Sequence, residues 1–219
     1  MSSTRATPAK PLNALSDEEL AVQAQDGSRE AFGLLFDRFS PRLFNFLLRR
    51  VGDAAIVEEL TQEAFLRAWQ AIDRYDSRWR FSTWLFTIGS RLASNHRRTA
   101  GRFMTNGEFN RFSGDDHRPE HIASAREERG QIWRLAEETL TEEQLAALWL
   151  RYAEDLPIAE VARVLDKTNV TVRVMLFRAR QALAARMAEK NKSSERNGGR
   201  RTAAPAVDAP AGEPQWTNA

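Results

Sequence analysis

Apolar residues recur along this 219-residue chain at intervals of three and four, which is the period of an α-helix. The clearest stripe lies in FSTWLFTIGSRLASNHRR, residues 81–98. Its apolar side chains fall on one side of the predicted helix: Phe81, Trp84, Leu85, Ile88 and Leu92. No segment shows the sustained period-two alternation of β-branched residues that marks a half-buried strand. The sequence therefore predicts an all-α protein.

Capping residues and breaks indicate where successive helices begin. Ser16 and Thr141 are each followed three residues later by Glu or Gln, which is the capping-box pattern. Ser82 is expected to cap the aromatic-rich helix. Because proline favours the first turn of a helix, Pro41 predicts that a helix at 29–39 ends and that a new one starts there.

These signals divide the chain into two small helical domains joined by a flexible linker. We expect a disordered N-terminal arm, a first domain, the linker, a second domain and a disordered C-terminal tail: residues 1–15, 16–100, 101–129, 130–190 and 191–219. The arm, the linker and the tail carry no helical stripe, and they are rich in polar residues, Pro and Gly. Helices are expected to resume near Arg129.

Charge and cysteine content limit the possible functions. The net charge is only +2, so nucleic-acid binding has to come from local basic clusters. One such cluster spans residues 163–201, with eleven Lys and Arg against three acids. The absence of cysteine excludes disulfides and thiolate metal sites and fits a reducing cytoplasm. The longest apolar run, residues 145–150, is too short to span a membrane, and no apolar signal core begins the chain.

A second stripe runs along the helix at 81–98. Thr87, Arg91, Ser94 and Arg98 share one face of it. Small hydroxyl side chains let a backbone approach closely, and the arginine fork suits phosphate. This face fits either a nucleic-acid backbone or, as charged faces commonly do, solvent.

Residues 157–187 have the layout of a helix-turn-helix: a short helix, a tight break and a longer helix. Asp166 can take the left-handed backbone of such a turn, and Thr168 can cap the second helix. The outward face of that helix combines cations with apolar groups: Arg173, Val174, Phe177, Arg178 and Gln181. Arg can bond guanine or phosphate, and Val and Phe can contact thymine methyls. The alternative is a hairpin whose apolar face packs on a neighbour, but the turn, this face and the basic tail together favour DNA reading.

Four blocks in this order and spacing resemble the extracytoplasmic-function (ECF) sigma factors, the small members of the bacterial sigma-70 family. The blocks are AFGLLFDRFSPRLFNFLLRRVGD, ELTQEAFLRAW, FSTWLF with its Arg-rich end, and LTEEQLAALWLRYAEDLPIAEVARVL followed by TVRVMLFRARQAL. The resemblance covers about residues 25–100 and 130–188. It implies a non-catalytic, cofactor-free specificity subunit that binds promoter DNA and core RNA polymerase through the β′ coiled coil and the β subunit. It also implies an anti-sigma factor as a partner, a cytoplasmic location and no membrane contact.

The resemblance also implies site residues. The first domain would hold the non-template strand of the minus-10 element, with the loop at 76–80 capturing a flipped-out base: Asp76, Ser77, Arg78, Trp79, Arg80, Thr87, Arg91, Ser94, Asn95 and Arg98. The second domain would read the minus-35 element: Thr168, Asn169, Arg173, Val174, Phe177 and Arg178. The polymerase would dock on an acidic and apolar helix face: Glu59, Gln62, Glu63 and Leu66.

Four positions depart from the family pattern. Arg91 stands where Asn is frequent, and Asn95 where Asp is frequent. Val174 and Met175 replace a common Ser-Arg pair in the reading helix. These departures bear on which promoter is read, not on the fold.

Three other functions are compatible with parts of the sequence. A stand-alone helix-turn-helix regulator would bind duplex DNA without polymerase, and an adaptor would use protein contacts only. An enzyme could use Asp115, Asp116, His117 and His121 as metal ligands. That site is disfavoured because no supporting residues surround it, and the chain has no phosphate-binding Gly loop, nucleophile elbow or HExxH motif.

Overall fold

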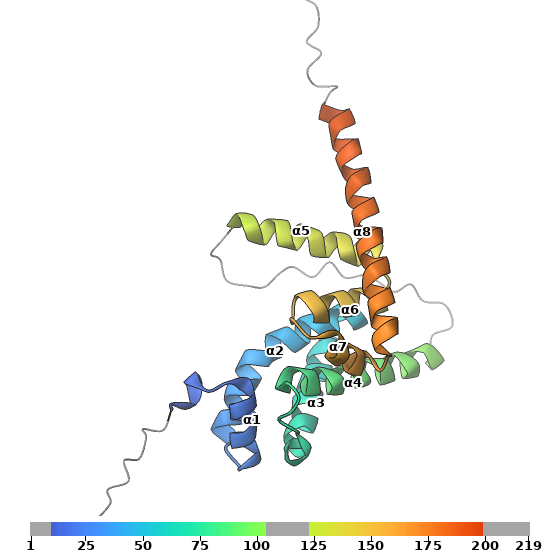
Figure 1. The fold of residues 1–219 in the computed structure, drawn as a ribbon. Coiled ribbons are helices and arrows are strands. Elements are labelled where there is room, and N and C mark those ends of the chain that lie inside the picture. The colour runs from blue at the N-terminus through green and yellow to red at the C-terminus, as the bar shows by residue number, and fades with distance from the viewer. Residues whose placement is uncertain (1–9, 104–122, 199–219) are drawn as a thin grey trace, which may run out of the picture. The chain divides into compact units, whose positions relative to one another are not determined.

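The computed structural model describes residues 10–103 and 123–198 (Figure 1). The 3₁₀ turns and α-helices follow in this order: η1 Leu12–Ala14, α1 Asp17–Gln25, α2 Arg29–Val51, α3 Ala54–Gln70, η2 Ile72–Arg74, α4 Phe81–Phe103, α5 Ala123–Thr139, α6 Glu142–Tyr152, α7 Ile158–Leu165 and α8 Asn169–Gly198. No strand occurs in the described ranges, so the all-α prediction is confirmed. The chain forms two compact units, Met1–Leu183 and Ala184–Ala219.

The predicted helix caps are present at α1 and α6. The Ser16 hydroxyl accepts from the backbone N–H of Glu19, whose carboxylate accepts from the Ser16 N–H in return. Thr141 and Gln144 make the same reciprocal pair. These caps satisfy N–H groups that have no partner within the helix, which fixes where each helix starts.

Pro41 lies inside a helix, so the prediction of a break at 40–41 is wrong. α2 runs without interruption from Arg29 to Val51. Proline cannot donate to the carbonyl four residues earlier, that of Asp37, and both residues lie on the exposed side of the helix. Phe39 and Leu43 on the opposite side are fully buried. Their burial on both sides of the proline keeps the helix continuous.

α4 differs from its prediction at its start and in its packing. The helix begins at Phe81, so Ser82 is a buried residue of the first turn and not its cap. Phe86, which falls on neither predicted stripe, is fully buried with its ring 5.2 Å from that of Phe46. α4 also packs closely on α2, since a side chain at Gly89 would approach Leu43 within 2.8 Å.

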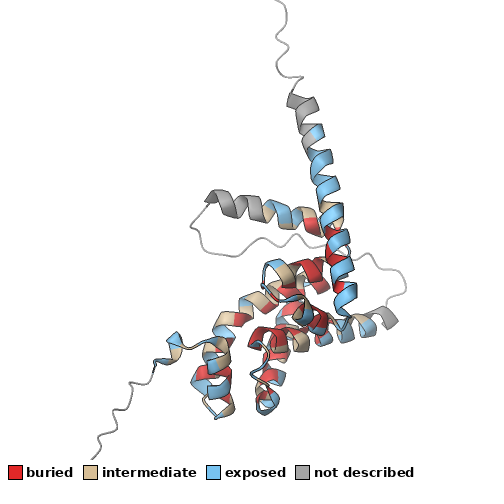
Figure 2. Ribbon diagram, in the orientation of Figure 1, coloured by how far each residue is buried: buried red, intermediate tan, exposed pale blue. Residues whose placement is uncertain are grey.

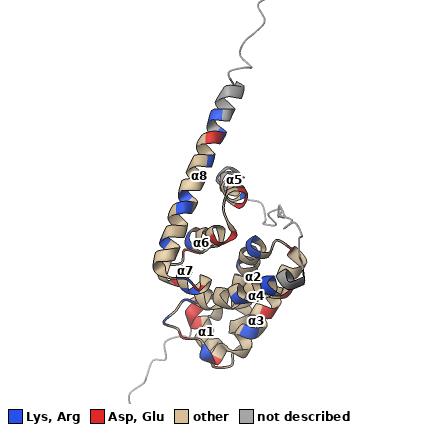
Figure 3. Ribbon diagram, turned by 90° about the vertical axis from the view of Figure 1, so that its right-hand side faces the viewer, with Lys and Arg blue, Asp and Glu red and all other residues tan. Residues whose placement is uncertain are grey.

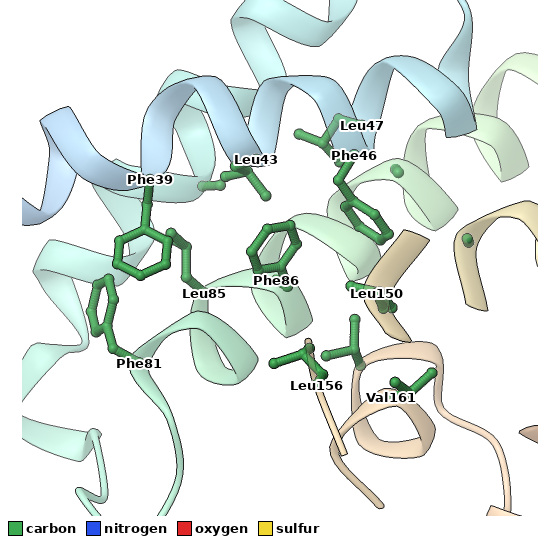
Figure 4. Packing of buried hydrophobic residues seen from close by; sticks show 14 of the residues in the cluster. Phe39, Leu43, Phe46, Leu47, Phe81, Leu85, Phe86, Leu150, Leu156 and Val161 are labelled. Atoms are coloured by element: carbon green, nitrogen blue, oxygen red, sulfur yellow. The ribbon is translucent and has the colours of Figure 1, made fainter. Parts of the chain in front are cut away.

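The first unit has one continuous apolar core (Figure 2). α1 to α4 form a helical bundle, and α6 and α7 pack on its α2 and α4 sides. Figure 4 shows side chains from α2, α4, α6 and α7 in a single cluster. Among the described residues, no helix is both long enough and apolar enough to cross a bilayer.

The helix-turn-helix prediction is confirmed in its local geometry. Asp166 ends α7 in the left-handed region, with φ 54°. The Thr168 hydroxyl accepts from the Thr171 N–H and so caps α8. The inward face of α8 is buried at Val172 and Ala179.

The segment boundaries differ from those predicted. Residues 10–15 are ordered, since the Arg38 guanidinium donates to the carbonyls of Asn13 and Leu15. α4 extends to Phe103, α5 begins at Ala123, and α8 continues to Gly198. The expectations for residues 1–9, 104–122 and 199–219 lie outside the described residues. The candidate metal ligands at 115–121 are among them.

Candidate nucleic-acid interface

The loop before α4 is held in shape by its own side chains. The Tyr75 hydroxyl, itself buried, donates to the carbonyl of Trp79 at 2.7 Å. Burial raises the pKa of Tyr75, so the hydroxyl keeps its proton and remains a donor. Asp76 accepts from the Arg78 side chain at 2.6 and 2.9 Å and from its backbone N–H at 3.0 Å. These bonds lower the pKa of Asp76 to about 2, so the pair is lost only as the pH falls toward that value.

The polar stripe of α4 continues from this loop. Arg91, Ser94, Asn95 and Arg98 are exposed, and Thr87 is half-buried. Thr87 and Ser94 donate to backbone carbonyls four residues earlier, so their oxygens stay on the helix surface. The structure thus brings the residues predicted for the minus-10 strand to one helix and the loop that precedes it.

Arg50 adjoins this stripe, and sequence reasoning missed it. It is almost fully buried, and its guanidinium donates to Ser90 at 2.5 Å and Glu142 at 3.2 Å. Burial, and after it the nearby charge of Arg97, lowers the pKa of Arg50 to about 10, so it is charged at neutral pH. In the sequence it looks like an ordinary basic residue at a helix end, and no pattern distinguishes it.

The outward face of α8 carries the residues predicted for the minus-35 element. All six are exposed: Thr168, Asn169, Arg173, Val174, Phe177 and Arg178. Val170 joins them with 66% of its surface exposed, and sequence reasoning missed it. Met175 is buried, so of the two departures in this helix only Val174 faces outward. Figure 3 shows basic residues recurring along α8.

α3 presents the predicted protein-binding face. Glu59, Gln62 and Leu66 are exposed, and half-buried Glu63 pairs with Arg67 at 2.6 Å. Phe36 of α2 extends this face: its ring lies 4.7 Å from that of Phe65 and 40% of its surface is exposed. Exposed apolar groups beside acids favour a protein partner over DNA.

Known proteins resemble this chain in sequence. The family model described as Sigma-70 region 2 matches residues 35–103, and the one described as Sigma-70, region 4 matches residues 131–183. The ECF RNA polymerase sigma factor BldN of Streptomyces coelicolor is 34% identical over 171 residues, which cover 76% of this chain and 64% of that protein. The ECF RNA polymerase sigma-E factor of Escherichia coli is 30% identical over 181 residues, covering 77% of this chain and 93% of that protein.

The chain is an ECF sigma factor of the sigma-70 family. A solved sigma factor has a similar fold: RpoE from Bartonella quintana, in complex with the anti-sigma factor NepR, matches with a TM-score of 0.57 and 21% identity. That match covers 69% of this chain and 93% of the other. In the chain described here, region 2 therefore contains the loop at 76–80, α3 and α4, and region 4 contains the helix-turn-helix.

Proposed function

We propose that this sigma factor binds core RNA polymerase, directs it to promoters and helps to open the DNA. The observation that carries the proposal is the presence of three chemically different surfaces. α4 and its loop offer hydroxyls, arginines and an aromatic ring, α8 offers exposed arginines beside apolar groups, and α3 offers acids beside Leu66. The protein itself is non-catalytic and needs no cofactor, because the polymerase supplies the chemistry. It would act in the cytoplasm, where that enzyme works.

Region 2 would take the single strand of the minus-10 element. Arg91 and Arg98 suit its phosphates, and the half-buried ring of Trp79 offers a stacking surface for a base that has left the duplex. The Asp76–Arg78 pair and the Tyr75 bond keep that loop in one conformation, which reduces the entropy lost on binding.

Region 4 would read the minus-35 element with α8 in the major groove. A recognition helix contacts base edges with its N-terminal turns. In α8 these turns carry the exposed arginines Arg173 and Arg178 and the exposed apolar residues Val174 and Phe177. An anti-sigma factor, as in the Bartonella complex, is the protein partner that we propose besides polymerase.

Run-off transcription on a genomic promoter library, with purified core polymerase and full-length protein, tests the proposal. We expect specific transcripts only when both are present. In an electrophoretic mobility assay, we expect promoter DNA to be retained only with polymerase. Tight and specific duplex binding by the free protein would instead support a stand-alone regulator.

Replacing Leu66 with Glu is expected to weaken binding to core polymerase about tenfold or more, because an exposed apolar anchor becomes a charge at the centre of the docking face. Binding would be measured by biolayer interferometry with immobilised polymerase. Val22→Glu is the matched control, since Val22 is an exposed apolar residue on α1. Equal losses in both variants would contradict a docking site on α3.

Replacing each minus-35 thymine with deoxyuridine is expected to weaken the polymerase complex about fourfold per contacted base, because each lost methyl contact contributes about 0.8 kcal/mol. In Val174→Ala and Phe177→Ala proteins this penalty is expected to shrink, as a double-mutant cycle would show. Met187→Ala is the control on the same helix, with similar exposure. An unchanged penalty in all three variants would rule out methyl reading by these side chains.

A further inference from the structure

The residues just before the loop at 76–80 are hydrogen-bonded to α1. The side-chain amide of Gln25, the last residue of α1, donates to the carbonyl of Ile72 at 3.0 Å and to that of Tyr75 at 2.8 Å. A glutamine amide has two N–H donors, so each carbonyl can receive one of its own. Gln25 therefore fixes the turn η2 and the point at which the loop begins.

The residue just after the loop is bonded to α1 as well. The Glu18 carboxylate accepts from the backbone N–H of Phe81, the first residue of α4, at 3.2 Å. The first N–H groups of a helix have no partner within it, and an acid there also suits the positive end of the helix dipole. Glu18 thus supplies, from 63 residues away in the chain, the acceptor that the sequence predicted at Ser82.

Glu18 and Gln25 can hold both ends of the loop because they lie on the same face of α1. Seven residues make about two turns, so the two side chains leave the helix on one side, ~10 Å apart along its axis. α1 is itself fixed to α2, since Arg38 donates to Asp17 at 2.8 Å and to the Leu15 carbonyl at 3.0 Å. The two ends of the loop are therefore held at a set separation by one anchored helix.

Tyr75 links these bonds to the residue that is proposed to stack on a base. Its carbonyl is held by Gln25, and its buried hydroxyl donates to the carbonyl of Trp79 at 2.7 Å. Its ring packs on those of Phe81 and Trp84, with the ring centroids 5.8 and 5.4 Å away. A shift of Tyr75 would therefore also move Trp79.

We infer that α1 is a positioning element for base capture, with Gln25 and Glu18 as its positioning residues. They hold the loop in a conformation that presents Trp79 and Arg80 to an unpaired base of the minus-10 strand. If only a fraction of the molecules had this conformation, the apparent dissociation constant would rise by the inverse of that fraction. α1 precedes residues 35–103, so the match to the region 2 family model does not include it. This inference rests on the proposed function, which supplies the base.

Replacing Gln25 with Met tests the inference, because methionine has a similar length and no N–H donor. Holoenzyme would bind a promoter recovered by run-off transcription, with its minus-10 region already unpaired and an abasic site at each non-template position in turn. In the wild type, loss of the captured base is expected to weaken binding about tenfold, because its stacking is lost. In Gln25→Met, we expect the intact promoter to bind about fivefold more weakly and this abasic penalty to fall to threefold or less.

The matched control is Gln23→Met, which makes the same change at an exposed position of α1. We expect it to behave as the wild type does. A variant that is merely less stable would bind intact and abasic promoters equally less well. An abasic penalty that stays near tenfold in Gln25→Met would therefore overturn the inference.

Glu18 offers a second pair of variants. Glu18→Gln and Glu18→Leu both remove the charge, but only glutamine keeps an oxygen that can accept from the Phe81 N–H. We expect the abasic penalty to stay near tenfold in Glu18→Gln and to fall to threefold or less in Glu18→Leu. Equal penalties in the two variants would contradict positioning through this hydrogen bond.

Hydrogen exchange of the free protein tests the anchoring without DNA. The backbone N–H groups of Tyr75 and Trp79 donate to the carbonyls of Ile72 and Asp76. In Gln25→Met we expect both amides to exchange at least fivefold faster, with exchange in α3 unchanged. Unchanged exchange at both amides would overturn the inference. Faster exchange, together with no abasic penalty at any position in the wild type, would support anchoring by α1 and count against the proposed function.

Discussion

Transcription from the cognate promoter is expected to fall about 100-fold when Arg173 and Arg178 are both replaced with Ala. Each exposed arginine can bond a base edge or a phosphate, and each such contact contributes about 1–3 kcal/mol. The measurement is run-off transcription with core polymerase at fixed salt, since phosphate contacts are strongly salt-dependent. Polymerase binding without DNA should be unchanged, because neither residue lies on α3.

The matched control is the pair Arg186→Ala and Lys190→Ala, which removes the same charge further along α8. This variant is expected to retain most of its activity. Undiminished transcription in the Arg173 and Arg178 variant would show that α8 does not read the promoter. A comparable loss in both variants would show that only the net charge of the helix matters.

Replacing Phe86 with Ala is expected to lower the free energy of unfolding by about 3–5 kcal/mol. The ring is fully buried and lies edge-on to Phe46, with 77° between the ring planes. Its loss removes both apolar burial and an aromatic pair, and leaves a cavity between α2 and α4. Urea unfolding followed by circular dichroism would measure the change.

Phe177→Ala is the control for that measurement, because 52% of Phe177 is exposed. It is expected to change the unfolding free energy by less than about 0.5 kcal/mol. A loss below about 1 kcal/mol in Phe86→Ala would mean that the α2–α4 contact does not stabilise the fold.

The helical period was sufficient to predict the fold class, and the capping residues were sufficient to predict the starts of α1, α6 and α8. Ser16 and Thr141 act locally, within three residues, so their effect can be seen in the sequence. The left-handed backbone of Asp166 was predictable for the same reason, because the turn that requires it spans only a few residues. Pro41 was not, since its local preference for a helix start is outweighed by burial of Phe39 and Leu43 against other helices.

The sequence alone did not predict which residues, distant along the chain, pack against one another. Phe86 packs on Phe46 of α2. A projection of the α4 sequence on one helix does not show that α2 lies beside Phe86. Arg50 is buried with its charge paired to Glu142, which is 92 residues away in the chain. Such pairs are set by tertiary contacts and leave no periodic signal in the sequence. The outward faces of α4 and α8 could be predicted because their residues recur at helical intervals, and the exposure of both faces agrees with this. The binding roles of these residues, and of those on α3, remain predictions.

Because α2 is one continuous helix, a movement of one of its ends also moves the other end. At 1.5 Å per residue its 23 residues span ~35 Å, and Phe36 and Arg50 are ~21 Å apart along the axis. A tilt of about 5° at the Phe36 end would swing the Arg50 end by about 2 Å, enough to break a hydrogen bond. A displacement at the end of α2 where polymerase is proposed to dock would therefore move Arg50 relative to Glu142.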